Sequence, residues 1–262
     1  MVKLVLTEDE TMLADSARGF LDKSAPVKAF RDLRDAGQTH DAKMWKEMAA
    51  MGWAGVLVPE SAGGVDMGHA AAGILAQEMG KTLAVSPFLS TAVIAATALR
   101  HVSDARAEAA LAKIASGDAT YALAVDETSK FNPDATAMTA TAEGNGFRLT
   151  GKKTFVVDGT LADRLLVLAK TDNGLTLFDI PADRAGITRN AQNMIDARDS
   201  ARIDFDNVEA TGDDVLGQVD DAMTVLKPAI EAGQAALAAE MAGVAAGAFG
   251  MTVGYLKERK QF

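Results

Sequence analysis

The chain contains no cysteine and only three histidines in 262 residues. Without cysteine there are no disulfide bonds and no thiolate metal ligands, so cysteine usage does not indicate the redox compartment. The histidines, His40, His69 and His101, share no spacing that is typical of metal ligands. We therefore expect no metal site.

Basic charge is also scarce. The chain has 26 Lys and Arg against 36 Asp and Glu, which gives a net charge of −10 and an isoelectric point near 4.8. A nucleic-acid-binding protein needs a basic face to neutralise phosphates. We therefore expect no nucleic-acid partner.

Long hydrophobic runs are missing as well. The apolar stretch Met1–Leu6 is too short for a signal peptide and no small-residue cleavage site follows it. The longest uncharged run, Met241–Leu256, is shorter than the roughly 18 residues that a membrane-spanning helix needs. The sequence predicts a cytoplasmic protein with no membrane span, and its 48% apolar content is enough for a substantial core.

Residues 1–117 have the pattern of an N-terminal helical domain. Thr7 and Glu10 form a capping box, in which the hydroxyl and the carboxylate each accept a backbone N–H at the start of a helix. Pro26 is expected to end this helix, and a second helix is expected to follow Asp41. Further helices are predicted over residues 69–79, 87–100 and 104–116.

Residues 118–217 change to short β segments separated by turns. Two turns, Gly144–Gly146 and Asp172–Gly174, are typical of hairpins. The pattern lacks the strand–helix alternation of a Rossmann domain, so it predicts an antiparallel sheet or small barrel. The predicted strands cover residues 119–126, 135–142, 147–150, 155–158, 165–171, 175–180 and 201–205.

Residues 218–262 are expected to be helical again. Between Ala232 and Gly250, 13 of 19 residues are Ala or Gly, which favours a helix packed closely in a bundle. The predicted fold class is therefore α+β multidomain. It has an N-terminal helical domain (1–117), a central antiparallel β domain (118–217) and the start of a C-terminal helical bundle (218–262).

Four motifs together resemble the acyl-CoA dehydrogenase family. The resemblance covers essentially the whole chain, and it implies FAD, an acyl-CoA substrate, an electron-transfer partner and a homo- or hetero-oligomer, dimeric or tetrameric. In that family the last motif opens a C-terminal helical domain, so the chain is expected to be truncated relative to the family. The motifs are Trp45–Gly64 (Gly-Trp, Val-Pro-Glu, Gly-Gly), Gln77-Glu78-Met79-Gly80, Gly151–Asp163 (Gly-x-Lys) and Tyr255-x-x-x-Arg259-x-Gln261-Phe262.

The resemblance also implies a set of flavin contacts. The backbone at Val125 and Asp126 would donate to the isoalloxazine, and the Asp126 carboxylate would either lower the reduction potential or turn outward into its loop. Phe155 would stack against the ring system, whereas Val157 lacks the hydroxyl that the family offers there. Finally, the family's C-terminal signature reaches the FAD of a neighbouring subunit, here through Arg259, Gln261 and Phe262.

The catalytic base is not identified by the motifs. Removing a proton next to a thioester requires a carboxylate aimed at that carbon. Members of the family carry this Glu either beyond the signature or on the preceding helix, where counting back from Tyr255 leads to Gly233. Glu231 and Glu240 lie nearby, and Glu240 is displaced by seven residues, or roughly 10 Å along a helix.

The leading hypothesis is an FAD-dependent acyl-CoA dehydrogenase, which would remove the α proton and transfer a hydride from the β carbon to flavin. The altered flavin contacts and the unassigned base leave three alternatives open. These are a non-catalytic subunit that pairs with an active relative, a flavin monooxygenase of the same fold, and a CoA- or acyl-binding module without a redox role.

Overall fold

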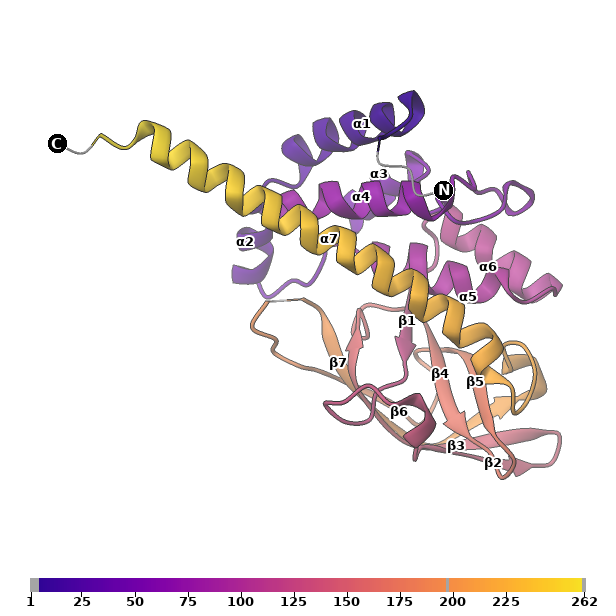
Figure 1. Ribbon diagram of the computed structural model, residues 1–262. Coiled ribbons are helices and arrows are strands. Elements are labelled where there is room, and N and C mark those ends of the chain that lie inside the picture. Colours follow the sequence, from indigo (N-terminus) through magenta and orange to yellow (C-terminus); the bar gives the residue numbers. More distant parts are fainter. Residues whose placement is uncertain (1–4, 197, 261–262) are drawn as a thin grey trace.

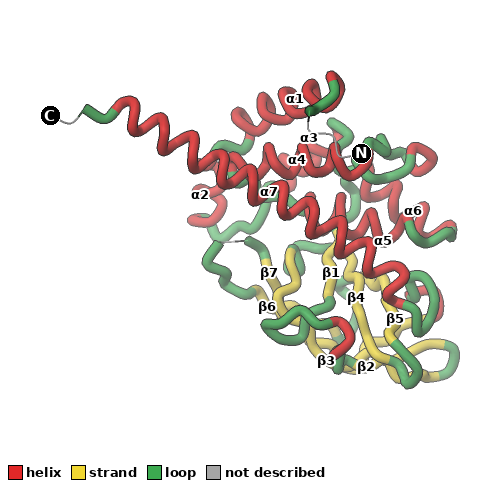
Figure 2. Tube along the Cα trace, viewed as in Figure 1, coloured by secondary structure: helices red, strands yellow, loops and turns green. Residues whose placement is uncertain are grey.

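A computed structural model describes residues 5–196 and 198–260, arranged in three parts. Helices form one layer, a β-sheet lies beneath them, and one long helix runs diagonally across both (Figures 1 and 2). This order of elements confirms the predicted fold class. The helical and β regions change over close to the predicted divisions, although the domain boundaries themselves stay a prediction.

The N-terminal layer begins with the predicted capping box. The amide of Glu10 donates to Thr7 Oγ1 over 3.2 Å, and the amide of Thr7 donates to Glu10 Oε2 over 2.7 Å. Asp41 caps a later helix by accepting from the amides of Lys43 and Met44. The helices are α1 (Glu8–Ser24), α2 (Val27–Asp35), α3 (Ala42–Ala50), α4 (Gly68–Thr82), η2 (Phe88–Ala95), α5 (Ala96–Arg100) and α6 (Ala105–Ala115), with a short 3-10 turn η1 (Glu60–Ala62).

Two details of this layer differ from the sequence prediction. Pro26 ends α1 but also stands directly before α2, a helix of nine residues that the sequence analysis did not predict. Its half-buried residues Val27, Phe30 and Leu33 have helical spacing. The predicted helix over 87–100 is continuous, yet its first part, η2, is wound as a π-helix. Such wide turns occur often at functional sites.

The sheet is mixed, and not purely antiparallel as predicted. β1 pairs with β4 in parallel, and β2 meets β4 in parallel at a single position. Its order is β1-β4-β2-β3-β7-β6, with β5 on the free side of β4. The strands are β1 (Tyr121–Ala124), β2 (Thr139–Glu143), β3 (Gly146–Val157), β4 (Arg164–Lys170), β5 (Leu175–Pro181), β6 (Ile187–Ala191) and β7 (Ser200–Thr211), with 3-10 turns η3 (Pro133–Ala135) and η4 (Gly212–Asp214).

The long helix α7 (Ala222–Glu258) holds the layers together. Its N-terminal part packs against β5, α5, η2 and α4. The contact with α4 is close: a Cβ on Gly243 would lie 1.9 Å from the carbonyl oxygen of Gln77. A Cβ on Gly80 would lie 2.1 Å from the carbonyl oxygen of Glu240. The small residues therefore allow the two backbones to touch, as their composition predicted.

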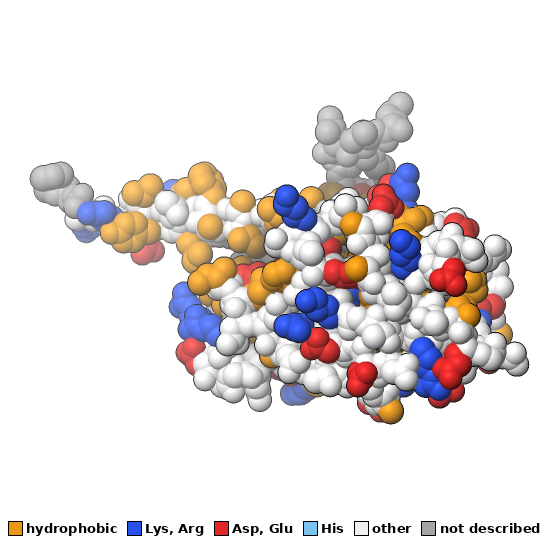
Figure 3. Space-filling view, turned by 90° about the horizontal axis from the view of Figure 1, so that it is seen from below, with side chains coloured by type: hydrophobic (Ala, Val, Ile, Leu, Met, Phe, Trp, Pro, Cys, Tyr) orange, Lys and Arg blue, Asp and Glu red, His pale blue; other side chains and the backbone are white. Residues whose placement is uncertain are grey.

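The C-terminal part of α7 projects beyond the body of the protein, and Figure 3 shows apolar side chains gathered along it. By length and composition α7 could cross a membrane, and only 11% of the window that meets this test is buried within the protein. One such helix is weak evidence, so the absence of a membrane span stays a prediction. The exposed apolar residues are Leu237, Met241, Val244, Phe249, Met251, Tyr255 and Leu256.

The contact between α4 and α7 can be tested with two glycines of the same helix. We expect Gly243→Ala to lower the free energy of unfolding by about 1–3 kcal/mol, because its methyl group would overlap the backbone of α4. Gly250→Ala is the control, since nothing lies within 4 Å of its Cβ position, and it should be neutral or slightly stabilising. Thermal unfolding of both variants measures this; equal melting temperatures would contradict the packing.

Candidate functional site

A bulge in β3 displays the predicted flavin-stacking residue. The pairing of β3 with β7 shifts register between Lys153 and Val156, and Phe155 adopts a left-handed backbone (φ 53°). Gln192 Oε1 accepts from the Phe155 amide over 2.8 Å and fixes this conformation. The Phe155 residue is 39% exposed, so it is available to a planar ligand. Bulges of this kind are common beside active sites.

A buried lysine ties the bulge to the end of β1. Lys153 Nζ donates to the carbonyl of Val125 over 3.0 Å and to Glu127 Oε1 over 2.8 Å. The Thr154 amide donates to the carbonyl of Asp126 over 2.7 Å. Burial lowers the pKa of Lys153, and the Glu127 carboxylate opposes this shift. The structure thus brings Val125 and Asp126 next to the strand that carries Phe155, and their contacts with a flavin stay a prediction.

Asp126 has an unusual environment. Its Oδ1 atom is buried and has no hydrogen-bond partner among the described residues. Burial raises the pKa of its carboxyl group, and the charge of Lys153 counteracts this in part. A buried polar atom without a partner is costly in a finished structure. The Asp126 Oδ1 atom therefore fits a site in which a bound polar ligand supplies its missing hydrogen bond.

A cavity of about 670 Å³ lies where the three parts of the protein meet. Its walls come from α2, α4, the segment 83–89, the end of β3, α7 and the residues Ile195, Asp196 and Arg198. Most lining side chains are apolar, among them Met79, Leu83, Phe88, Val157, Leu237 and Met241, and the charged lining residues are Arg34, Asp158, Asp196, Arg198 and Glu240. An apolar cavity with a few charged groups is typical of a small-molecule site.

The structure separates the two candidates for the base. Glu240 is half-buried, lines the cavity and forms an ion pair with Arg198. Glu231 is exposed and lines none of the cavities described here. At Gly233, where the family comparison pointed, a Cβ would lie 2.7 Å from Ile94 Cγ1, so this position is closely packed.

Asp158 is a cavity residue that the sequence analysis missed. It is 5% exposed, has a left-handed backbone (φ 58°) and makes a short hydrogen bond with Ser90 Oγ of η2. Burial raises the pKa of its carboxyl group to about 7; the hydrogen bond from Ser90 and the charge of Arg198 oppose this shift, and Asp199 and Glu240 reinforce it. A carboxyl group directly after the apolar end of β3, Phe155–Val157, was the available signal, but Ser90 lies 68 positions earlier in the chain.

The predicted C-terminal contacts lie far from this cavity. Arg259 is exposed at the end of α7, with its guanidinium carbon 5.6 Å from the centre of the Tyr255 ring. Gln261 and Phe262 lie outside the described residues. Among the described residues, the contacts given for Arg259 are with Tyr255 of the same helix. Its predicted role toward a neighbouring subunit stays a prediction.

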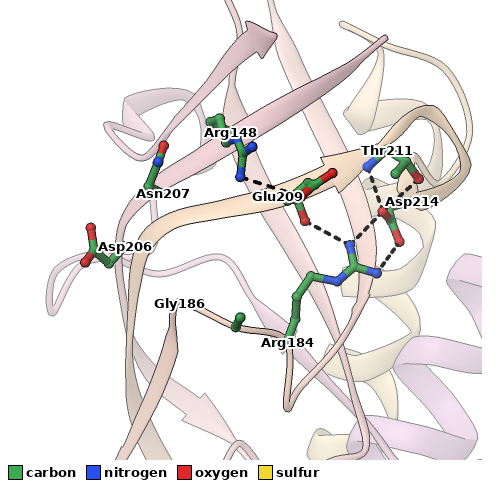
Figure 4. Close-up of a pocket in the computed structure, with 9 residues that line it drawn as sticks. Arg148, Arg184, Gly186, Asp206, Asn207, Glu209, Thr211 and Asp214 are labelled. Atoms are coloured by element: carbon green, nitrogen blue, oxygen red, sulfur yellow. Dashed lines mark hydrogen bonds and ion pairs between the residues drawn. The ribbon is translucent and has the colours of Figure 1, made fainter. Parts of the chain in front are cut away.

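A second hollow, of about 730 Å³, lies on the β domain (Figure 4). Its arginines already have acidic partners: Arg184 donates to both oxygens of Asp214 over 2.7 and 2.9 Å, and Arg148 lies 3.7 Å from Glu209. The hollow includes none of the predicted site residues. Neutralised arginines are poor anion ligands, so we place the candidate site in the cavity between the three parts.

Comparisons with known proteins agree with the motifs. A family model described as acyl-CoA dehydrogenase, N-terminal domain, matches residues 7–118. A 3-(aryl)acrylate reductase of Clostridium sporogenes is 26% identical over 99% of this chain and 71% of its own length. Acyl-CoA dehydrogenase FadE27 of Mycobacterium tuberculosis is 32% identical over 62% of this chain.

A solved structure described as a steroid ACAD variant (Tcur3481–Tcur3483) superposes with a TM-score of 0.86 at 30% identity. The match covers 97% of this chain and 68% of that one. The chain spans only 42% of the length of FadE27, so the activity of a whole relative cannot be transferred to it directly.

The buried carboxyl group of Asp158 predicts a pH dependence of stability. Its pKa is raised in the folded state from 3.8 to about 7, so the unfolded chain releases this proton first as the pH rises. The contribution of this group is therefore complete below about pH 4 and is lost as the pH rises toward 7. We expect Asp158→Asn, which cannot ionise, to avoid this loss of at most about 4 kcal/mol.

Chemical denaturation between pH 4 and 8 measures the difference between Asp158→Asn and wild type. The free energy of unfolding of Asp158→Asn should increase relative to that of the wild type as the pH rises. Asp172→Asn, in the exposed turn between β4 and β5, is the matched control and should show no trend. A constant difference for Asp158→Asn would contradict the assignment of a neutral buried acid.

Proposed function

Because the chain belongs to the acyl-CoA dehydrogenase family, we propose that it forms the acyl-binding half of a flavin-dependent oxidoreductase acting on acyl-CoA thioesters. The observation that carries this proposal is the cavity between α4, α7 and the end of β3. It combines apolar walls, suited to an acyl chain, with a carboxylate, Glu240, that is already ion-paired to Arg198. The exposed Phe155 lies two residues from the cavity-lining Val157.

FAD is the cofactor that we propose, and the residues at its expected position fit it in part. Phe155 offers an exposed aromatic face, and Asp126 offers a buried oxygen that needs a partner. Val157 offers no hydroxyl. When bound, a flavin would supply the acceptor for a hydride.

We assign Glu240 the role of general base in this reaction. Its carboxylate would take the proton from the carbon next to the thioester carbonyl, and the electrons of that C–H bond would form the new double bond as a hydride leaves the β carbon. Arg198 would hold the carboxylate in position through their ion pair. The apolar walls would exclude water from the reacting carbons.

The proposal is tested by spectroscopy of the purified protein. We expect a flavin absorption spectrum that bleaches when an acyl-CoA is added without oxygen. Glu240→Gln should slow bleaching by about 10²- to 10⁴-fold, because the variant lacks the base. Glu231→Gln, on the exposed side of the same helix, should bleach at the wild-type rate.

Other outcomes would contradict the proposal in specific ways. Flavin that does not bleach would favour a monooxygenase, and acyl-CoA binding without flavin would favour a binding module. Equal bleaching rates for both glutamate variants would remove Glu240 as the base.

A second candidate is a non-catalytic subunit that completes the site of an active relative. The missing hydroxyl at Val157 and the acidic side chain of Asp126 favour it, because both change expected flavin contacts. In that case flavin would bind only after mixing with the second polypeptide. The projecting apolar part of α7 would suit such an assembly, homo- or hetero-oligomeric, and an electron-transfer partner would be needed to reoxidise the flavin.

A further inference from the structure

A second cavity, of about 260 Å³, adjoins the cavity of the candidate site. We call the larger one the main cavity and the smaller one the side pocket. Both are lined by the same four residues, Phe30, Leu83, Ala84 and Val85, which therefore form a wall shared by the two spaces. The rest of the side pocket comes from the end of α1, from α2 and from the start of α3.

The lining of the side pocket suits a hydrocarbon. Ala25, Leu33 and Met44 are among its apolar residues. Its charged residues already have partners, since Asp41 caps α3 and Asp32 is paired with Lys28 of the same helix. Both carboxylates belong to exposed residues, so burying an apolar group in the side pocket leaves them in water.

Leu83 of the shared wall has a strained backbone. It ends α4 with a left-handed conformation (φ 56°), and the following amide, of Ala84, donates to the carbonyl of Met79 over 3.0 Å. Glycine is the usual residue at such a helix end, because a side chain is disfavoured there. The Leu83 residue is nevertheless 37% exposed. Strain of this kind persists mostly at functional sites.

Helix α2, which carries Phe30, is held to the protein only loosely. None of its residues is buried. Among the described residues, every hydrogen bond and ion pair of the segment 26–38 lies within that segment. Its attachment therefore depends on half-buried apolar side chains such as Phe30 and Leu33. Elements with so few buried contacts move most easily and often cover binding sites.

We propose that the side pocket extends the acyl site and that Phe30 is a specificity-determining residue at the entrance to it. The proposal rests on acyl binding in the main cavity, as proposed above. A short acyl group stays within the main cavity. A long acyl chain displaces the Phe30 ring, which the loosely held α2 permits, and its distal end fills the side pocket. The substrate class is therefore the CoA thioesters of long-chain acyl groups.

Calorimetric binding of two non-reactive thioethers, hexyl-CoA and hexadecyl-CoA, tests the proposal. Ala29 lines the side pocket but not the main cavity, so Ala29→Trp should fill the side pocket alone. We expect at least about tenfold weaker binding of the hexadecyl thioether and unchanged binding of the hexyl thioether. Ala36→Trp is the matched control, because Ala36 is exposed at the end of α2 and lines neither space. It should bind both thioethers like the wild type.

Phe30→Ala tests the entrance without adding bulk. Because the long chain no longer has to displace the ring, the preference for hexadecyl-CoA over hexyl-CoA should increase by roughly two- to tenfold, the cost of reordering one side chain. An unchanged or smaller preference would show that Phe30 is an ordinary wall residue and would overturn its assigned role. Thermal unfolding of each variant checks that it is folded.

The outcomes separate this inference from the proposed function. If Ala29→Trp weakened both thioethers equally, or neither, the side pocket would not belong to the acyl site, while binding of hexyl-CoA to the wild type would still support the main cavity. If the wild type bound neither thioether, the proposed function itself would be contradicted, and the inference with it.

Discussion

The backbone contact between α4 and α7 places the key carboxylate of this protein. Gly80 leaves room for the carbonyl oxygen of Glu240, and Gly243 leaves room for that of Gln77. Because the two helices touch at the level of the backbone, the backbone of Glu240 lies directly against α4. The cavity is the space left between these helices and the end of β3, so its shape follows from the same contact.

The cavity also brings charged groups close together. Two carboxyl groups, Asp158 and Glu240, face one guanidinium group, that of Arg198. Burial raises the pKa of Asp158, whereas the hydrogen bond that Ser90 donates lowers it. The Glu240 carboxylate is held by the guanidinium group of Arg198.

The sequence predicted those features that depend on neighbouring residues. The capping box of Thr7 and Glu10 is confirmed, and the Ala/Gly-rich run predicted the close packing of α7. Helix α2 was not predicted, although Val27, Phe30 and Leu33 have helical spacing, because it has only nine residues directly after Pro26. Strand β6 was not predicted because it is short and its residues are largely exposed.

The candidate site was predicted less completely because tertiary contacts create it. Phe155 is displayed only because β3 bulges and Gln192 fixes its backbone. Asp158 becomes a site residue only when β3 meets η2, and Glu240 only when α7 meets the segment that carries Arg198. No local pattern in the sequence contains that information.

The central claim is that the cavity between α4, α7 and β3 binds the acyl chain of a CoA thioester. The most direct measurement is calorimetric binding of a non-reactive acyl-CoA thioether to the wild type, to Leu237→Trp, which fills the cavity, and to Ala238→Trp, which lies outside its lining. The account predicts at least about tenfold weaker binding for Leu237→Trp, or roughly 1.4 kcal/mol, and unchanged binding for Ala238→Trp. Equal affinity for all three proteins would contradict it.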